Sequence, residues 1–260
     1  MKSGIRATVY RLLGDRAGSM IHRMYRCVIS PFRPDLTGEE EMLLQHVSEA
    51  VRPGDAVIDV GAHTGAWSRR LSGIVGPDGT VIAFEPVPSN LAVLERRTSR
   101  LANVVCLGSA LSDSDGQAEI LVPVDTYRPS TGALEGTADQ IADHTGLKKL
   151  TVRTQRLDGI AAGLLAGRRL SLIKCDVEGH ELQVLHGSIE TVRTHLPVVV
   201  LEILREKWEN GDPCSSGPAR LLEGLGYTIA QVSPSGLVQD PNDFDPRFEN
   251  FLFTPGTGSG

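Results

Sequence analysis

Asp55-Ala-Val-Ile-Asp59-Val-Gly61-Ala-His-Thr-Gly65 is the stretch of sequence that decides the fold. Its apolar residues predict a short strand that ends near Asp59, and two glycines follow in the turn. Glycine at a strand-to-helix turn lets a ligand approach the backbone closely, and such turns form the binding edge of open α/β sheets. We therefore expect a binding site at this turn and a helix over residues 63–75 behind it.

Strand and helix patterns alternate along most of the chain. The expected strands lie at residues 55–61, 80–86, 103–111, 117–124, 149–159, 170–179, 196–204, 226–233 and 250–255. The expected helices lie at residues 37–51, 63–75, 89–101, 180–193 and 218–225, with Ser89 as an N-cap. This order predicts a Rossmann-like α/β fold with a mostly parallel sheet, right-handed crossovers and an antiparallel C-terminal strand.

The N-terminal part differs from the rest of the chain in charge. Residues 1–34 carry seven Lys or Arg and one acidic residue, whereas the whole chain has a net charge of −6. Apolar residues at helical spacing over 5–28 predict basic amphipathic helices that pack on their own domain or on a second subunit, with membrane-surface contact as the alternative. We expect residues 1–53 to be an N-terminal helical extension, 54–254 the main domain and 255–260 a disordered tail.

The composition argues against several classes of protein. A length of 260 residues with 40% hydrophobic residues fits one α/β domain. The net acidic charge argues against nucleic acid as a partner, because phosphate binding needs a basic face. The four cysteines lack the spacing of a zinc site or a disulfide framework, so we expect reduced thiols in a cytoplasm. No apolar run predicts a secretory signal or stable membrane insertion.

A second acidic position completes a predicted nucleoside site. The strand at 80–86 ends in Glu85-Pro86, and a carboxylate there accepts hydrogen bonds from ribose hydroxyls. A dinucleotide fold expects G-x-G-x-x-G, but His63 stands at the second glycine and the sequence holds no phosphate-binding loop. S-adenosylmethionine has no phosphate, so the D-x-G-x-x-x-G pattern from Asp59 favours this cofactor. The alternatives are an NAD(P)-dependent oxidoreductase and a non-catalytic nucleoside-binding scaffold.

Residues 173–181, Ile-Lys-Cys-Asp-Val-Glu-Gly-His-Glu, form a second motif at the end of an apolar strand. Asp176 in this motif is expected to orient an acceptor hydroxyl, act as a base or bind a metal, and capping the next helix is the structural alternative. Glu178 and His180 face either the site or solvent. Glu202 lies in the apolar run VVVLEI, where a buried charge needs a partner, so we expect it at the site as well.

These motifs resemble the FkbM family of methyltransferases. The resemblance covers residues 54–254 and is carried by DVGAHTG, AFEP, SALSDSDG, LDG, IKCDVEGHELQVLHG and NFLF, among which DVEGHE is the most specific. It implies a class I methyltransferase fold for this region, with S-adenosylmethionine as cofactor. It also implies methylation of hydroxyls on sugars, polyketides or related metabolites, and some related sugar methyltransferases use Mg²⁺.

The resemblance further implies roles for single residues. Its cofactor-binding set is Asp59, Gly61, Ala62, His63, Thr64, Gly65, Glu85, Pro86, Ser109, Ala110 and Asp176. In this set the glycine turn surrounds the methionine part of the cofactor and Glu85 holds the ribose. Ser109 and Ala110 line the adenine pocket, and Asp176 lies near the methyl group. The family often has Asn where His63 stands, which puts the contact to the cofactor carboxylate in question.

Methyl transfer to a hydroxyl requires alignment of the acceptor oxygen and removal of its proton. The candidate bases are Asp176, His144 and His180, with Glu202 as a further catalytic carboxylate. His144 belongs to the loop at 124–148, where acceptor-specific residues are expected. A divalent ion such as Mg²⁺, held by Asp176 and Glu202, would instead lower the pKa of the acceptor. We expect an O-methyltransferase whose small-molecule acceptor is a sugar or saccharide, or else a polyketide; a homodimer is compatible with the charge distribution.

Overall fold

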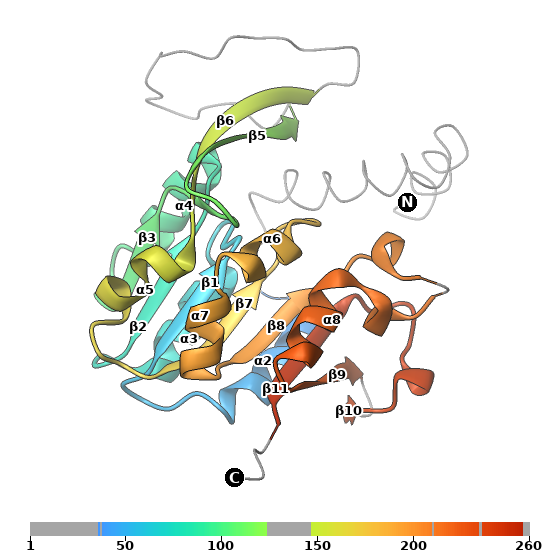
Figure 1. Ribbon diagram of the computed structural model, residues 1–260. Helices are drawn as coiled ribbons and strands as arrows, with labels where there is room; N and C mark the ends of the chain where they lie inside the picture. Colours follow the sequence, from blue (N-terminus) through green and yellow to red (C-terminus); the bar gives the residue numbers. More distant parts are fainter. Residues whose placement is uncertain (1–35, 37, 124–146, 210, 234–235, 257–260) are drawn as a thin grey trace, which may run out of the picture. The chain divides into compact units, whose positions relative to one another are not determined.

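The computed structural model describes residues 36, 38–123, 147–209, 211–233 and 236–256 (Figure 1). The chain divides into two compact units, of which the larger comprises residues 34–117 and 153–260 and the smaller residues 1–33 and 118–152. The helices predicted over 5–28 lie outside the described residues, as does most of the loop at 124–148. Among the described residues, no helix has both the length and the apolar character needed to cross a membrane.

An eight-stranded sheet in the order β10-β9-β11-β8-β7-β1-β2-β3 forms the centre of the larger unit (Figure 1). Its strands are β1 (Ala56–Val60), β2 (Thr80–Phe84), β3 (Val104–Leu107), β7 (Leu170–Cys175), β8 (Val198–Glu202), β9 (Tyr227–Ser233), β10 (Gly236–Val238) and β11 (Asn250–Pro255). The strands from β8 to β3 in this order are parallel, whereas β11 lies antiparallel between β8 and β9. The predicted mostly parallel sheet with an antiparallel C-terminal strand is therefore confirmed.

The strand order reverses at β1. The chain builds β2 and β3 on one side of β1 and then returns to place β7 and β8 on the other side. In open α/β sheets, ligands bind outside the carboxyl ends of the strands at such a reversal. The carboxyl ends of β1 and β7 are therefore where this fold favours a binding site.

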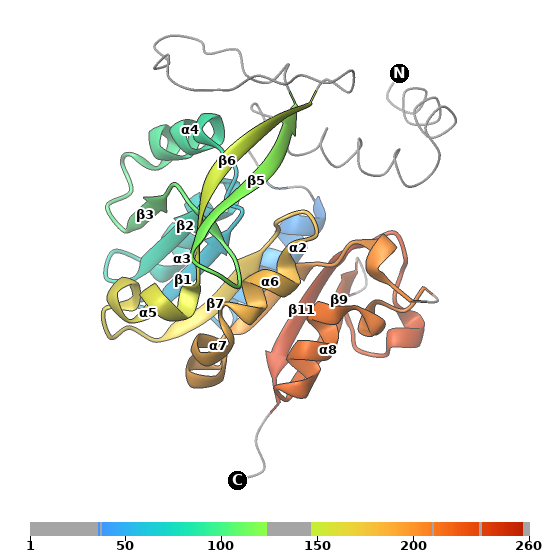
Figure 2. The ribbon, with the colours of Figure 1, turned by 45° about the horizontal axis from the view of Figure 1, so that its top comes forward.

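Helices cover both faces of the sheet, which is why every residue of β1, β2, β7 and β8 is buried. The helices are α2 (Gly38–Ser48), α3 (Ala66–Val75), α4 (Pro88–Thr98), α5 (Leu157–Leu165), α6 (Glu181–His186), α7 (Ile189–His195) and α8 (Gly217–Gly224). Apolar residues of α2 and α3 pack with Val57 and Leu172 on one face. Those of α5 to α8 pack with Ile58 and Ile173 on the other face. Figure 2 shows these four helices on the same side of the sheet.

A second, three-stranded sheet has the order β4-β6-β5. It contains β4 (Ala110–Leu111), β5 (Gly116–Pro123) and β6 (Leu147–Gln155), and β4 pairs with β6 in parallel. The strands predicted at 117–124 and 149–159 correspond to β5 and β6. Three short 3-10 helices, η2 (Arg205–Lys207), η3 (Pro213–Ser215) and η4 (Pro241–Asp243), lie between the later elements.

Four local predictions differ from the structure. Ser89 is not an N-cap, because α4 already begins at Pro88, whose fixed φ and missing N–H suit the first helical turn. The helix predicted over 180–193 is two helices, α6 and α7. They break at Gly187, where a Cβ would lie 1.9 Å from the carbonyl oxygen of Ser112. The strand predicted over 103–111 is divided into β3 and β4. The strand predicted over 149–159 ends at Gln155, and α5, which was not predicted, begins at Leu157.

Candidate active site

The two sequence motifs meet at the carboxyl ends of β1 and β7. These strands pair in parallel up to Val60 and Cys175, and the amide of Asp176 donates to the carbonyl oxygen of Val60 at 3.1 Å. Gly61 has φ of 73°, and a Cβ on it would lie 2.0 Å from the carbonyl oxygen of Asp176. The contact with Asp176 by itself requires glycine at position 61, because a side chain there would push the two motifs apart.

Hydrogen bonds hold the glycine turn in place. Asp59 is fully buried, and its Oδ2 accepts a hydrogen bond from the Ser68 hydroxyl at 2.6 Å. The Arg97 guanidinium donates to the Thr64 hydroxyl at 2.8 Å and to the Thr64 carbonyl oxygen at 3.2 Å. His63 adopts φ of 51°, a left-handed conformation that is uncommon for residues other than glycine. The turn is therefore a fixed loop between β1 and α3.

Glu85 connects the end of β2 to this turn. Its carboxylate accepts hydrogen bonds from the amides of His63 at 2.8 Å and Val87 at 2.9 Å, and from the side chain of Asn90 at 3.4 Å. Burial is the largest influence on this carboxyl, and it raises the pKa of Glu85 to about 7 despite these hydrogen bonds. The adjacent Pro86 is partly exposed. The sequence predicted that the glycine turn and the end of β2 would share one site. The hydrogen bond from the His63 amide to Glu85 joins these two segments.

Lys174 is a buried residue of β7, and the sequence patterns assigned it no role. The Lys174 ammonium lies 3.5 Å from a carboxylate oxygen of Asp59 and 3.5 Å from one of Asp176. Burial lowers the pKa of Lys174, but attraction to Asp176, Asp59 and Glu40 outweighs it, so the pKa lies above its usual range. The argument applied to Glu202, that a charge inside an apolar strand needs a partner, would have identified Lys174 as well.

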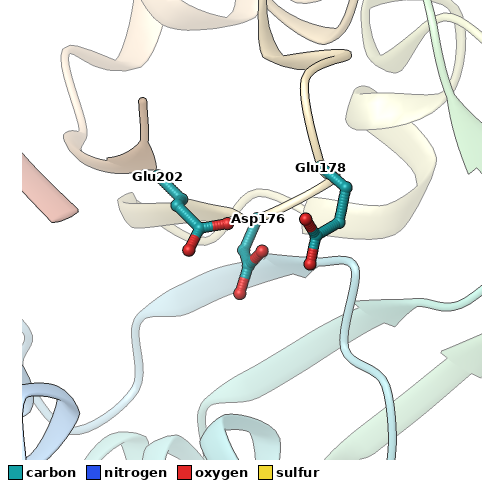
Figure 3. A group of neighbouring side chains, drawn as sticks. All are labelled: Asp176, Glu178 and Glu202. Carbon is teal, nitrogen blue, oxygen red and sulfur yellow. The ribbon is translucent and has the colours of Figure 1, made fainter. Parts of the chain in front are cut away.

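Three carboxylates converge beside this ion pair. Oxygens of Asp176, Glu178 and Glu202 all lie within 4.8 Å of one another, and Figure 3 shows the three side chains directed toward a common point. Asp176 and Glu202 come from the ends of neighbouring parallel strands, β7 and β8. The sequence placed these two together, but it left open whether Glu178 faces the site.

The loop after β7 explains the position of Glu178. Glu178 has φ of 57°, and this strained conformation is held by the buried carboxylate of Glu181. That carboxylate accepts hydrogen bonds from the amides of Val177 at 3.2 Å and Gly179 at 3.0 Å. Glu181 therefore accepts hydrogen bonds from amides that precede α6, the task that the sequence offered as the structural alternative for Asp176.

The remaining candidates from the sequence are His180, Ser109, Ala110 and His144. His180 precedes α6, and its Nε2 lies 2.9 Å from the Ser112 hydroxyl in a hydrogen bond that ties the loop to the segment after β4. Burial lowers the pKa of His180. The buried Ser109 donates a hydrogen bond to Gln155 at 3.0 Å, and Ala110 begins β4. His144 lies outside the described residues.

Comparison with known proteins identifies the family. The model of the family described as "Methyltransferase FkbM domain" matches residues 59–232, which include the glycine turn, Glu85, Asp176 and Glu202. The chain belongs to the FkbM methyltransferase family. The matched range lies within the main domain predicted from the sequence.

Two relatives of this FkbM-family protein are curated methyltransferases. Methyltransferase sdnD of Sordaria araneosa is 28% identical over 200 residues, which is 67% of this chain and 74% of that protein. Hexuronic acid methyltransferase AglP of Haloferax volcanii is 28% identical over 170 residues, 65% of this chain and 64% of that protein. The structure of methyltransferase FkbM from Methylobacillus flagellatus superposes with a TM-score of 0.45 at 15% identity, covering 91% of this chain and 60% of that one.

The raised pKa of Glu85 predicts a pH-dependent stability. The ordinary pKa is 4.5 and the folded value is about 7. The folded protein therefore binds more protons at this group between these two pH values than the unfolded chain does. The free energy of unfolding should fall as the pH rises through this window, by up to about 1.4 kcal/mol per pH unit.

Urea unfolding of the wild type and Glu85→Gln at a series of pH values isolates this contribution. The free energy of unfolding of the wild type relative to the variant should fall with rising pH, because glutamine does not titrate. A difference that stays constant across the window would show that burial does not perturb Glu85.

Proposed function

We propose that this protein is an S-adenosylmethionine-dependent O-methyltransferase. The observation that carries the proposal is the set of carboxylates at the ends of β1, β2, β7 and β8, namely Asp59, Glu85, Asp176 and Glu202. S-adenosylmethionine carries a sulfonium cation, which such a site attracts. A nicotinamide dinucleotide carries an anionic pyrophosphate, which the same carboxylates repel. The charge of the site thus favours S-adenosylmethionine over a nicotinamide dinucleotide as the cofactor.

The residues of the turn have distinct expected tasks in this proposal. Gly61, Ala62, His63, Thr64 and Gly65 surround the methionine part of the cofactor. Their backbone is held by hydrogen bonds of the His63 amide to Glu85 and of Arg97 to the Thr64 carbonyl oxygen. Glu85 and Pro86 bind at the ribose, and Ser109 and Ala110 at the adenine.

Proton removal from the acceptor is the main chemical task of the protein. When bound, S-adenosylmethionine supplies a methyl group on an activated sulfonium. Asp176 accepts the proton of the acceptor hydroxyl while the C–O bond forms and the C–S bond breaks, its electron pair going to sulfur. The ammonium of Lys174 lies 3.5 Å from an Asp176 oxygen, so this ion pair helps to position the carboxylate at the end of β7. His180 is bonded to Ser112, so we assign it to holding the loop. His144 remains a proposed residue of acceptor selection.

A sugar or saccharide is the proposed acceptor, with a polyketide as the second choice. The relative AglP, a hexuronic acid methyltransferase by name, supports the choice of a saccharide. Sugar hydroxyls are good hydrogen-bond donors, and the clustered carboxylates are strong acceptors for them. We retain from the sequence the main domain at 54–254 with its N-terminal extension, a cytoplasmic location and a homodimer as proposals.

The proposed function is tested by calorimetric titration with S-adenosylhomocysteine, NAD and NADP. We expect micromolar binding of S-adenosylhomocysteine and no binding of either dinucleotide. A screen of sugar and polyketide acceptors with labelled S-adenosylmethionine then identifies the substrate. Binding of NAD or NADP instead would establish the oxidoreductase alternative, and binding of S-adenosylhomocysteine without transfer to any acceptor would favour a non-catalytic scaffold.

Asp176→Asn should remove the base without removing the cofactor site. We expect kcat with the acceptor from the screen to fall by about 10²–10⁴-fold, because general-base catalysis contributes that much. The affinity for S-adenosylhomocysteine should stay within a few-fold. The exposed Asp243→Asn is the matched control and should leave both values unchanged. Wild-type turnover in Asp176→Asn would remove Asp176 from the mechanism.

The donor set of Asp176, Glu178 and Glu202 also fits a divalent cation, and we propose this group as its site. Oxygens on opposite sides of Mg²⁺ lie about 4.2 Å apart and those on opposite sides of Ca²⁺ about 4.8 Å apart. The three carboxylates lie within this range, at no more than 4.8 Å from one another. A cation bound there would instead lower the pKa of the acceptor hydroxyl, as the alternative to proton transfer to Asp176.

Thermal unfolding with and without Mg²⁺ or Ca²⁺ tests this site directly. Either ion should raise Tm in a saturable manner, because a ligand of the folded state stabilises it. Glu202→Gln should abolish the increase, whereas the exposed Glu190→Gln should retain it. An equal increase in Glu202→Gln would show that the cations bind elsewhere.

A further inference from the structure

Lys174 lies where the glycine turn after β1 meets the end of β7. It is the register partner of Asp59 across β1 and β7. Its ammonium contacts Asp59 and Asp176, and it donates a hydrogen bond to the Gly61 carbonyl oxygen at 3.3 Å. The ammonium thus touches the acidic ends of both strands and the turn that follows β1.

The contact between Lys174 and Asp59 is mainly one of charge. Oδ2 of Asp59 is hydrogen-bonded by Ser68, whereas Oδ1 has no hydrogen bond from the described part of the chain and lies 3.5 Å from the ammonium. Both side chains are shielded from water and bulk ions, because the exposed fraction is 0% for Asp59 and 7% for Lys174. A buried charge without a counter-charge is strongly unfavourable, so each partner requires the other.

The net charge of the site affects the binding of two related molecules differently. S-adenosylmethionine and S-adenosylhomocysteine differ by one methyl group and one positive charge. Carboxylates near the sulfonium favour the charged form, and an ammonium among them opposes this preference. The ratio of the two affinities therefore measures the net charge around the sulfonium, because effects on the shared part of the two molecules cancel.

We propose that Lys174 is the charge-balancing residue of the cofactor site and sets the preference for S-adenosylmethionine over S-adenosylhomocysteine. This inference rests on the proposed function, because it requires that the site bind these two molecules. The role proposed for Lys174 differs from that of Asp176, the proposed base, and from that of Glu85, the proposed ribose-binding residue.

Calorimetry with S-adenosylmethionine and S-adenosylhomocysteine on the full chain provides the test. Lys174→Met removes the charge at similar length and should raise the affinity ratio in favour of S-adenosylmethionine by about threefold, because a positive charge that opposes the sulfonium is lost. Lys174→Arg keeps the charge and should stay within twofold of the wild type.

The ion pair between Arg169 and Asp55 is a matched control. It joins the same two strands at their opposite ends, with Nη2 of Arg169 2.6 Å from Oδ2 of Asp55. Arg169→Met therefore also removes a positive charge and an ion pair between β1 and β7, but far along the strands from Asp176. We expect it to lower stability and to leave the affinity ratio unchanged.

A second pair of variants keeps the test valid if Lys174→Met does not fold. Asp176→Asn should lower the affinity ratio, because it removes a negative charge. Lys174→Met in the Asp176→Asn background restores the charge balance, and its ratio should return toward the wild-type value. An unchanged ratio on adding Lys174→Met to a folded protein, alone or in this background, would overturn the role of Lys174. Failure of the wild type to bind either molecule would instead overturn the proposed function, and this inference with it.

Discussion

The close approach of two backbones at the ends of β1 and β7 is the constraint on which the site depends. Gly61 leaves room for the carbonyl of Asp176, and no residue with a Cβ fits there without moving one of the strands. This contact packs the glycine turn directly against the loop that begins at Asp176. The position of Asp176 relative to Asp59 is then fixed by main chain, and side-chain interactions refine it.

Electrostatic compensation is the second requirement of this arrangement. Acidic side chains gathered at one edge of a sheet repel one another, and the fold offsets this repulsion in two ways. Lys174 supplies a cation between two of them. Backbone amides supply hydrogen bonds to Glu85 and Glu181, so that these carboxyls are accommodated within the protein despite burial.

The sequence was most informative where a pattern extended over a whole element. Apolar runs bounded by glycine and acidic residues located the parallel strands. At their ends the structure places Asp176 near Glu202 and, through Lys174, near Asp59. It was least informative where a single contact decides the outcome. The break between α6 and α7 depends on the approach of Gly187 to Ser112, and the orientation of Glu178 depends on the bonds of Glu181. Such contacts join residues that the sequence does not show to be neighbours.

The strand order also bears on how the protein folds as it is synthesised. β1 and β2 leave the ribosome early and can pair with each other. The other edge of β1 pairs with β7, so Ala56 can pair with Leu170 only after β7 has been synthesised. Until then an apolar strand edge is unpaired, and non-local parallel pairing of this kind is slow. The carboxylates of Asp176 and Glu202 converge only once β8 has been added, and the core is completed later still, when β11 pairs with β8.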